Sequence, residues 1–186
     1  MKVLLVDAFP PDSPDRGLVD TAVATLRAGT HDVEHVTLPG GPFATFMSAD
    51  ERRAYHGDEP LISPETEAAA AAVQRADALL FCYPTTTFTV PAVLKSWMER
   101  VLVPGVAFVF DDKERVRPGM TNIRRIGMIT ATDHDARTTR QARDAGRRTI
   151  LWNLRLSCHR FCRRTFVSVA ADSGDDEPVR RALQRW

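Results

Sequence analysis

Five short segments with strand character, separated by segments with helical periodicity, constrain the fold of this chain more than any other feature. Apolar runs predict strands at residues 3–6, 78–83, 125–130 and 166–170, and an alternating pattern predicts a short, more exposed strand at residues 32–38. The first run, Val3-Leu4-Leu5-Val6, is apolar at every position, which is typical of a strand buried on both faces of a sheet. Strands that alternate with helices form a parallel sheet with right-handed crossovers. We therefore expect a three-layer α/β fold, with five parallel strands in the order 2-1-3-4-5.

The segments between these runs carry recognisable helix signals. Helices are predicted at residues 17–27, 48–55, 64–75, 91–101, 133–156 and 177–185. Ser48 and Glu51 have the spacing of a capping box, and Ser63 is predicted to cap a helix that has proline at its first position. Asp133 is expected to cap the long helix that reaches Leu156.

Length and charge exclude several classes of protein. With 186 residues and 44% hydrophobic content, the chain is expected to form a single domain over residues 1–186. A net charge of +1 gives no electrostatic reason to expect binding to nucleic acid. The arginines of residues 137–164 are interpreted as a solvated helix face. Residues 3–6 are too short for the core of a signal peptide, and no apolar run has the length of a membrane span, so we expect a cytoplasmic protein.

The cysteines predict neither a disulfide framework nor a metal centre. Cys82, Cys158 and Cys162 are odd in number and have no paired spacing. Cys82 lies in an apolar strand run and is interpreted as a core residue. His159 stands between the other two cysteines, but no second cluster of ligands completes a site there, so no metal is predicted.

The loop after the first strand has residues suited to phosphate. The loops after the first, third and fourth strands are expected to converge on one edge of such a sheet. Residues 7–17 lead into a helix, whose N-terminus presents free backbone N–H groups and a partial positive charge. Ser13 adds a hydroxyl and Arg16 adds a cation. The alternative is a surface turn in which Ser13 or Asp15 caps the helix.

Residues 81–110 carry the most specific pattern in the chain. They read FCYPTTTFTVPAVLKSWMERVLVPGVAFVF, which is an apolar strand, a Pro/Thr-rich elbow and a helix opened by Pro91. This segment resembles the flavin-ring loop of the quinone reductases of the flavodoxin-like superfamily. Those proteins carry a similar strand–P-x-(W/Y)-W-x-x-P-A-x-L-K-x-W-x-(D/E)-R-V–helix run, followed by G-x-A-F. The resemblance is close here, looser from Met1 to Thr132 and weak beyond, and it implies a flavodoxin-like fold.

The resemblance assigns cofactor-binding positions to the first loop. The family pattern there is A-H-P-x-x-x-S-F-N, whose last three positions and whose histidine fall on Ser13, Pro14, Asp15 and Phe9. Ser13 and the backbone of residues 13–17 are expected to hold the flavin phosphate, with Arg16 beside them. Asp15 brings a negative charge where the family has an amide, and Phe9 removes a polar contact.

In the second loop, the resemblance implies that backbone groups and an aromatic pair contact the flavin. The residues at these positions are Pro84, Thr85, Thr86, Thr87 and Phe88. Thr86 and Thr87 stand where the aromatic residues are expected, which removes a large apolar contact. This change is expected to weaken flavin binding or to admit a bulkier substrate. The alternative is a polar loop whose pattern reflects descent alone.

The third loop resembles the T-T-G-G loop of the family, whose backbone donors reach the flavin edge that becomes anionic on reduction. Its residues are Thr130, Ala131, Thr132, Asp133 and His134. The first four are predicted to bind the cofactor. His134 is predicted as the catalytic residue, donating a proton to a reduced flavin or to a quinone oxygen. The alternative is an exposed loop histidine without a catalytic role.

Together these residues and the resemblance imply a flavin-dependent NAD(P)H oxidoreductase that reduces quinones or similar electrophilic aromatics by two-electron ping-pong hydride transfer. FMN is the expected cofactor, FAD is the alternative, and NAD(P)H is the hydride donor. The family builds its active site at a two-fold interface, so a homodimer is expected. The candidate surface comprises Lys95, Trp97, Met98, Arg100, Phe108 and Phe110.

Two other functions remain open. One is a non-catalytic binding or regulatory module, such as an ancillary subunit, with weak or no flavin binding. The other is a one-electron carrier like flavodoxin, which a net charge of +1 disfavours because those carriers are strongly acidic. Neither G-x-G-x-x-G nor G-x-x-x-x-G-K-(S/T) occurs, so Rossmann and P-loop sites are not predicted.

Overall fold

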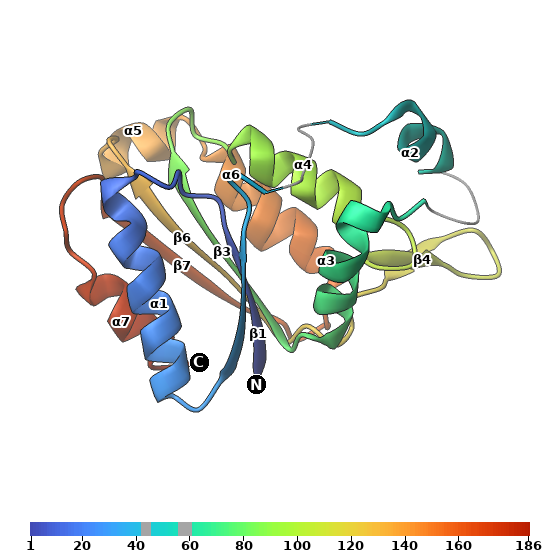
Figure 1. Cartoon of the computed structure of the whole chain (residues 1–186), viewed down its shortest axis with the longest axis horizontal. Helices are drawn as coiled ribbons and strands as arrows, with labels where there is room; N and C mark the ends of the chain where they lie inside the picture. Colours follow the sequence, from blue (N-terminus) through green and yellow to red (C-terminus); the bar gives the residue numbers. More distant parts are fainter. Residues whose placement is uncertain (42–45, 56–60) are drawn as a thin grey trace.

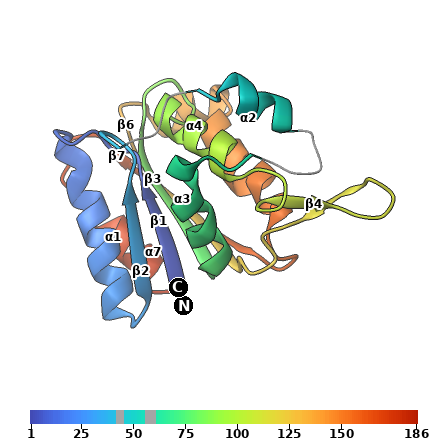
Figure 2. The ribbon, with the colours of Figure 1, turned by 45° about the vertical axis from the view of Figure 1, so that its right-hand side comes forward.

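A five-stranded parallel sheet forms the centre of the structure, a computed structural model that describes residues 1–41, 46–55 and 61–186 (Figures 1 and 2). Its strands are β1 (Lys2–Asp7), β2 (Asp32–Thr37), β3 (Ala78–Thr85), β6 (Arg125–Thr132) and β7 (Arg163–Ala170). They lie in the order β2-β1-β3-β6-β7, and all neighbouring pairs are parallel. Since β6 and β7 are the fourth and fifth strands of this sheet along the chain, the predicted order 2-1-3-4-5 and the α/β fold class are confirmed.

Helices cover both faces of the sheet (Figures 1 and 2). One face carries α1 (Gly17–Ala28) and α7 (Glu177–Leu183), and the other carries α3 (Pro64–Arg75), α4 (Ala92–Val101) and a π-helical segment, η2 (Thr149–Asn153). The short helix α2 (Ala49–Ala54) lies outside these layers. None of the helices in the described part of the chain has the length and apolarity that a membrane span requires.

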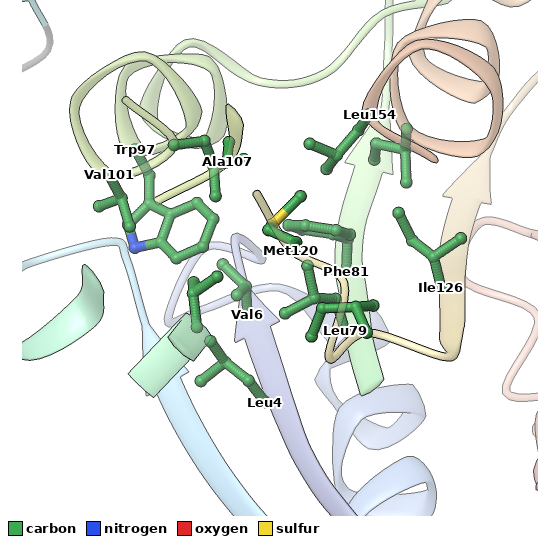
Figure 3. Close-up of a cluster of buried hydrophobic side chains, with 14 of the residues drawn as sticks. Leu4, Val6, Leu79, Phe81, Trp97, Val101, Ala107, Met120, Ile126 and Leu154 are labelled. Carbon is green, nitrogen blue, oxygen red and sulfur yellow. The ribbon is translucent and has the colours of Figure 1, made fainter. Parts of the chain in front are cut away.

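The core follows from the alternation of side chains along the strands. In β1, Val3 and Leu5 face α1 and α7, whereas Leu4 and Val6 face α3 and α4. Figure 3 shows the cluster of buried side chains between the sheet and α3 and α4, in which Trp97 of α4 lies over the sheet. Trp97 is fully buried, and its ring meets that of Phe81 edge to face with centroids 6.1 Å apart. Strands that are buried on both faces explain the continuous apolar runs in the sequence.

The prediction of a single long helix over residues 133–156 is wrong. The segment contains α5 (Ala136–Gln141), α6 (Ala145–Arg148), η2 and a 3₁₀ turn, η3 (Leu154–Ser157). Asp135, and not Asp133, caps α5 through its side chain. Arg143 adopts a φ of 58° and Asp144 a φ of 17°, which right-handed helical backbone does not allow. The chain therefore bends sharply between α5 and α6.

A small hairpin was not predicted from the sequence. Strands β4 (Phe108–Phe110) and β5 (Val116–Pro118) pair antiparallel, apart from the main sheet. Asp111 holds the turn, because its Oδ1 accepts hydrogen bonds from the backbone N–H groups of Lys113 and Arg115, each at 3.0 Å. Strands of three residues carry too little periodicity to be recognised.

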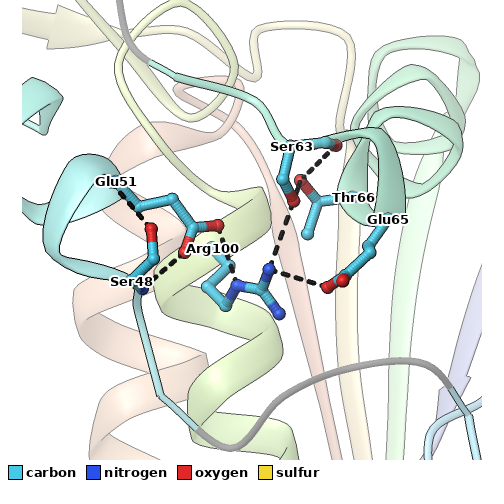
Figure 4. Close-up of polar contacts among 6 residues, drawn as sticks. All are labelled: Ser48, Glu51, Ser63, Glu65, Thr66 and Arg100. Carbon is cyan, nitrogen blue, oxygen red and sulfur yellow. Dashed lines mark hydrogen bonds and ion pairs between the residues drawn. The ribbon is translucent and has the colours of Figure 1, made fainter.

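Arg100 of α4 ties α2 and α3 to the body of the molecule (Figure 4). The predicted capping box is confirmed: Ser48 Oγ accepts from the N–H of Glu51 at 3.1 Å, and Glu51 Oε2 accepts from the N–H of Ser48 at 2.7 Å. Glu51 Oε1 also accepts from Arg100 Nε at 2.9 Å. Arg100 Nη2 donates to Glu65 at 2.9 Å and to Ser63 Oγ at 3.2 Å. Ser63 occupies the N-cap position of α3, as predicted, but its side chain makes no capping hydrogen bond and accepts from Arg100 instead.

Two residues of the expected dimer surface are buried within the chain. Trp97 is fully buried and Arg100 is 4% exposed, so neither can contact a second subunit as predicted. Lys95 remains exposed and Met98 half-buried on the same helix, and Phe110 is exposed on β4.

Candidate functional site

The loops after β1, β3 and β6 lie at the carboxyl end of neighbouring strands (Figure 1). β1 pairs with β3 up to Asp7 and Cys82, and β3 pairs with β6 up to Thr85 and Thr132. Because the chain leaves β1 towards β2 on one side and continues with β3 on the other, this is a topological switch point, where open α/β sheets bind ligands. The structure thus brings the three predicted loops to the same edge of the sheet.

The second and third loops contact each other directly. The hydroxyls of Thr85 and Thr130 lie 2.5 Å apart. The His134 ring stacks on Phe88 with centroids 4.2 Å apart, and its Nε2 is 2.9 Å from the carbonyl oxygen of Thr86. A carbonyl oxygen only accepts, so Nε2 carries the proton and donates this hydrogen bond. Nδ1 is then the nitrogen of His134 that remains for a ligand.

Helix α6 supports the second loop through a contact between Gly146 and Phe88. Phe88 adopts a φ of 57°, and its carbonyl oxygen accepts a hydrogen bond from the N–H of Gly146 at 3.1 Å. A Cβ on Gly146 would lie 2.8 Å from the hydroxyl of Tyr83, so only glycine permits this approach. Burial, and then the charge of Asp144, raise the pKa of Tyr83, which stays protonated. A glycine inside a predicted helix was the sequence signal for the close approach of Gly146 to Tyr83 and Phe88, and this signal was missed.

The first loop is held mainly by contacts within the protein. Ser13 Oγ accepts from the N–H of Asp15 at 3.3 Å and caps the 3₁₀ turn η1 (Pro14–Arg16), as the alternative interpretation expected. Arg16 Nη2 lies 3.1 Å from the buried carboxylate of Asp7, and Nη1 donates to the Phe9 carbonyl at 3.3 Å. The charge of Arg16 is therefore largely neutralised, whereas the Ser13 hydroxyl can still donate to a phosphate.

Several predicted residues support the loops rather than face a ligand. The side chain of Phe9 is fully buried in the cluster under α1, so its assignment as a cofactor contact is corrected to a core residue. Thr85, Thr130, Ala131 and Thr132 are buried strand ends. The predicted residues that remain at least partly exposed are Ser13, Pro14, Asp15, Arg16, Pro84, Thr86, Thr87, Phe88, Asp133 and His134.

The donors of the second and third loops fit the polar edge of a flavin. In the described part of the chain, no hydrogen bond is found from the backbone N–H groups of Thr86, Thr87, Phe88 and Asp133. Unpaired, accessible N–H groups on adjacent loops suit the carbonyl and ring-nitrogen acceptors of an isoalloxazine. The stacked rings of Phe88 and His134 supply the aromatic surface at this position.

A cavity of about 690 Å³ adjoins these loops on the side of β7. Thr132 and His134 line the part that it shares with the third loop. Arginines of α5 and α6 line much of the remainder. These arginines were predicted to lie on a solvated helix face and were not among the predicted site residues.

Comparison with protein families identifies the fold family. The profile of Flavodoxin_2, described as the flavodoxin-like fold, matches residues 1–186. The chain belongs to this family. The result confirms the family resemblance inferred from residues 81–110.

This flavodoxin-like protein is similar to several quinone oxidoreductases. It is 32% identical over 104 residues to NAD(P)H dehydrogenase (quinone) 1 from Rattus norvegicus, covering 56% of this chain and 38% of the relative. It is 33% identical over 125 residues to an FMN-dependent NADH:quinone oxidoreductase from Gluconacetobacter diazotrophicus, covering 59% of each. The matches therefore span less than two thirds of these relatives. The structure of an NAD(P)H:quinone oxidoreductase from Methanothermobacter marburgensis superposes with a TM-score of 0.78 at 21% identity, covering 100% of this chain and 94% of that chain.

Proposed function

We propose that this flavodoxin-like protein is a flavin-dependent oxidoreductase that uses NAD(P)H to reduce quinones or similar electrophilic aromatics. The observation that carries the proposal is the pair of loops that His134 joins at the switch point of the sheet through Phe88 and the Thr86 carbonyl. Among the described residues, the backbone N–H groups of Thr86, Thr87, Phe88 and Asp133 in these loops have no hydrogen-bond partner. The names of the relatives support this chemistry, and FMN in one of them makes it the preferred cofactor over FAD. A bound flavin supplies the redox chemistry by accepting hydride from NAD(P)H and passing two electrons to the acceptor.

The residues of the chain would bind and orient the reactants. Residues 84–88 and 130–134 would hold the ring, and Ser13 with the backbone of residues 13–17 would hold the phosphate. His134 would stabilise charge at the ring or at the acceptor through Nδ1 in its protonated form, since Nε2 is already bonded to the Thr86 carbonyl. Donor and acceptor would use the same face in turn, which gives ping-pong kinetics.

The proposal includes a homodimer and a cytoplasmic location. Among the described residues, Phe88 and His134 are the aromatic side chains found at the ring loops, so a second subunit would shield the remaining face. The accessible members of the expected surface are Lys95, Met98, Phe108 and Phe110. The three free cysteines support a reducing compartment.

A non-catalytic flavodoxin-like module is the second candidate. Two observations favour it: Asp7 neutralises Arg16 beside the proposed phosphate position, and Thr86 and Thr87 replace the aromatic residues of the family. Such a module would keep the fold and lose the cofactor.

Purified protein distinguishes the two candidates. After incubation with FMN and removal of the excess, an enzyme should show flavin absorbance, turn over NAD(P)H with a quinone, and give parallel lines in double-reciprocal plots. Sedimentation velocity at micromolar concentration on the same sample should give the mass of a dimer. Protein that retains no flavin and has no turnover would support the module and contradict the enzyme.

Replacement of His134 tests its proposed role. His134→Ala is expected to lower turnover about 100-fold while flavin stays bound. His134→Gln keeps a donor for the Thr86 carbonyl but cannot become charged, so it should be impaired similarly. His31→Ala, at the opposite end of the sheet from the site, is the control. Full activity of the glutamine variant would show that His134 only positions the loop.

A further inference from the structure

The cavity beside the ring loops is bounded by two walls. Phe166, Ser168 and Ala170 of β7 form one of them. β7 is the edge strand, so no further strand covers this side of the sheet. The bent segment from α5 to η2 forms the other wall. With a volume of about 690 Å³, the cavity is in the range of small-molecule and cofactor sites.

The second wall is strongly basic. Arg140, Arg143, Arg147 and Arg148 line it, with Asp144 as the one acidic lining residue. Among the described residues, none of these four arginines forms an ion pair with a carboxylate, whereas the arginines of the hairpin and of α7 do so. Neighbouring like charges repel each other, and an anion bound between them would relieve that repulsion.

The local contacts hold this charge at the cavity. Asp144 Oδ1 accepts from the backbone N–H of Arg147 at 2.9 Å, so this carboxylate caps α6. The guanidinium carbon of Arg147 lies 4.3 Å from the centre of the Phe166 ring, a cation–π contact across the two walls. The arginine is thereby positioned over an apolar surface while its outer donors remain free.

The arginines lie on both sides of the bend at Arg143 and Asp144. On a continuous helix, Arg140, Arg143 and Arg147 would share one face, which was predicted to be solvated. Arg137 shows the contrast: like the four lining arginines it is exposed, but it does not line the cavity. What distinguishes the four arginines from Arg137 is therefore their position beside the cavity.

The cavity is continuous with the proposed ring site. Thr132 and His134 line the cavity, and His134 also contacts Phe88 and the Thr86 carbonyl. A ligand in the cavity would have one end beside the flavin ring and the other among the arginines. The hydride donor has this form, since a nicotinamide ring is joined to several phosphate groups.

We propose that the arginine cavity holds the phosphates of the hydride donor and makes this protein selective for NADPH over NADH. The inference rests on the proposed function. NADPH carries a 2′-phosphate that NADH lacks, and guanidinium groups bind phosphate through paired, charge-assisted hydrogen bonds. The excess of four arginines over one aspartate suits this additional dianion.

Binding of nucleotide fragments tests the site without turnover. Calorimetry should show adenosine 2′,5′-bisphosphate binding at least about tenfold more tightly than 5′-AMP. The double variant Arg143→Gln/Arg147→Gln should bind the bisphosphate about 10- to 100-fold more weakly, and its loss of affinity for 5′-AMP, which lacks the 2′-phosphate, should be smaller. Arg137→Gln makes the same charge change on α5 outside the cavity and should leave both affinities unaltered. If the double variant does not fold, Arg140→Gln and Arg148→Gln take its place.

Anaerobic reduction of the flavin by NADPH and by NADH provides the second readout. The double variant should lose the preference for NADPH and reduce equally well with NADH. Equal binding of the two fragments would overturn the proposal. A double variant that is impaired only in reoxidation by an anionic aromatic acceptor would also overturn it, and would assign the cavity to the acceptor. A protein that binds flavin and turns over, but does not discriminate between NADPH and NADH, would overturn the proposed selectivity and leave the proposed function standing. Discrimination of the fragments by a protein that binds no flavin would instead overturn the proposed function.

Discussion

Arg100→Ala is expected to lower the free energy of unfolding by about 3–5 kcal/mol. The change would leave the carboxylate of Glu51, which is 5% exposed, without its charged partner. It would also remove the bonds from Arg100 to Ser63 and Glu65 that join α4 to the start of α3 (Figure 4). Chemical denaturation monitored by circular dichroism measures the loss.

The effect of Arg100→Ala should depend on pH. Burial raises the pKa of Glu51, but hydrogen bonds from the Ser48 N–H and from Arg100 outweigh it and leave the pKa below its ordinary value. A depressed pKa contributes stability above the unfolded-state pKa, and this contribution is lost as the pH falls below about 4. The difference between wild type and variant should therefore shrink at low pH. Lys95→Ala, which removes an exposed ion pair on the same helix, should cost less than about 1 kcal/mol at every pH. Equal losses for both variants would contradict the role of burial.

Trp97→Ala is expected to destabilise the protein by about 3–5 kcal/mol, with a cavity left between α4 and the sheet. Trp97 is fully buried in the cluster of Figure 3 and meets Phe81 edge to face. Its Nε1 has no hydrogen-bond partner among the described residues. Trp97→Phe removes this unpaired N–H while keeping most of the volume, so it should cost less than about 1.5 kcal/mol.

Trp152 provides the matched control for this change, because its side chain is 57% exposed and lies outside the core cluster. Trp152→Ala should alter the free energy of unfolding by no more than about 0.5 kcal/mol. Thermal and urea denaturation of the three variants would establish the ranking. A loss below about 1 kcal/mol for Trp97→Ala would mean that the surrounding side chains collapse into the space.

Local signals in the sequence predicted most of the architecture. Strand order, fold class and the Ser48–Glu51 capping box were correct, because apolar periodicity and capping depend on residues near each other in the chain. The convergence of the three ligand loops followed from strand order alone. Their location at one edge did not require any knowledge of side-chain contacts.

The contacts made by individual site residues could not be predicted in this way. The neutralisation of Arg16 by Asp7 and the burial of Phe9 depend on how α1 packs against the sheet. His134 reaches Thr86 through a contact between residues separated by 48 positions. These pairings are set by packing, and no pattern within either loop indicates them.

By itself, the sequence determined the parallel sheet, its strand order and the loops at its carboxyl edge, because these depend on hydrophobic burial at regular spacing. Only the tertiary structure decided the course of residues 133–156. There, helical periodicity continues through the sequence, but the left-handed backbone of Arg143 breaks the helix between α5 and α6, and Gly146 of α6 closely approaches Tyr83. Four arginines of this segment line a cavity together with the edge strand β7. Helix propensity is a matter of tenths of a kcal/mol per residue, so packing against a distant strand overrides it.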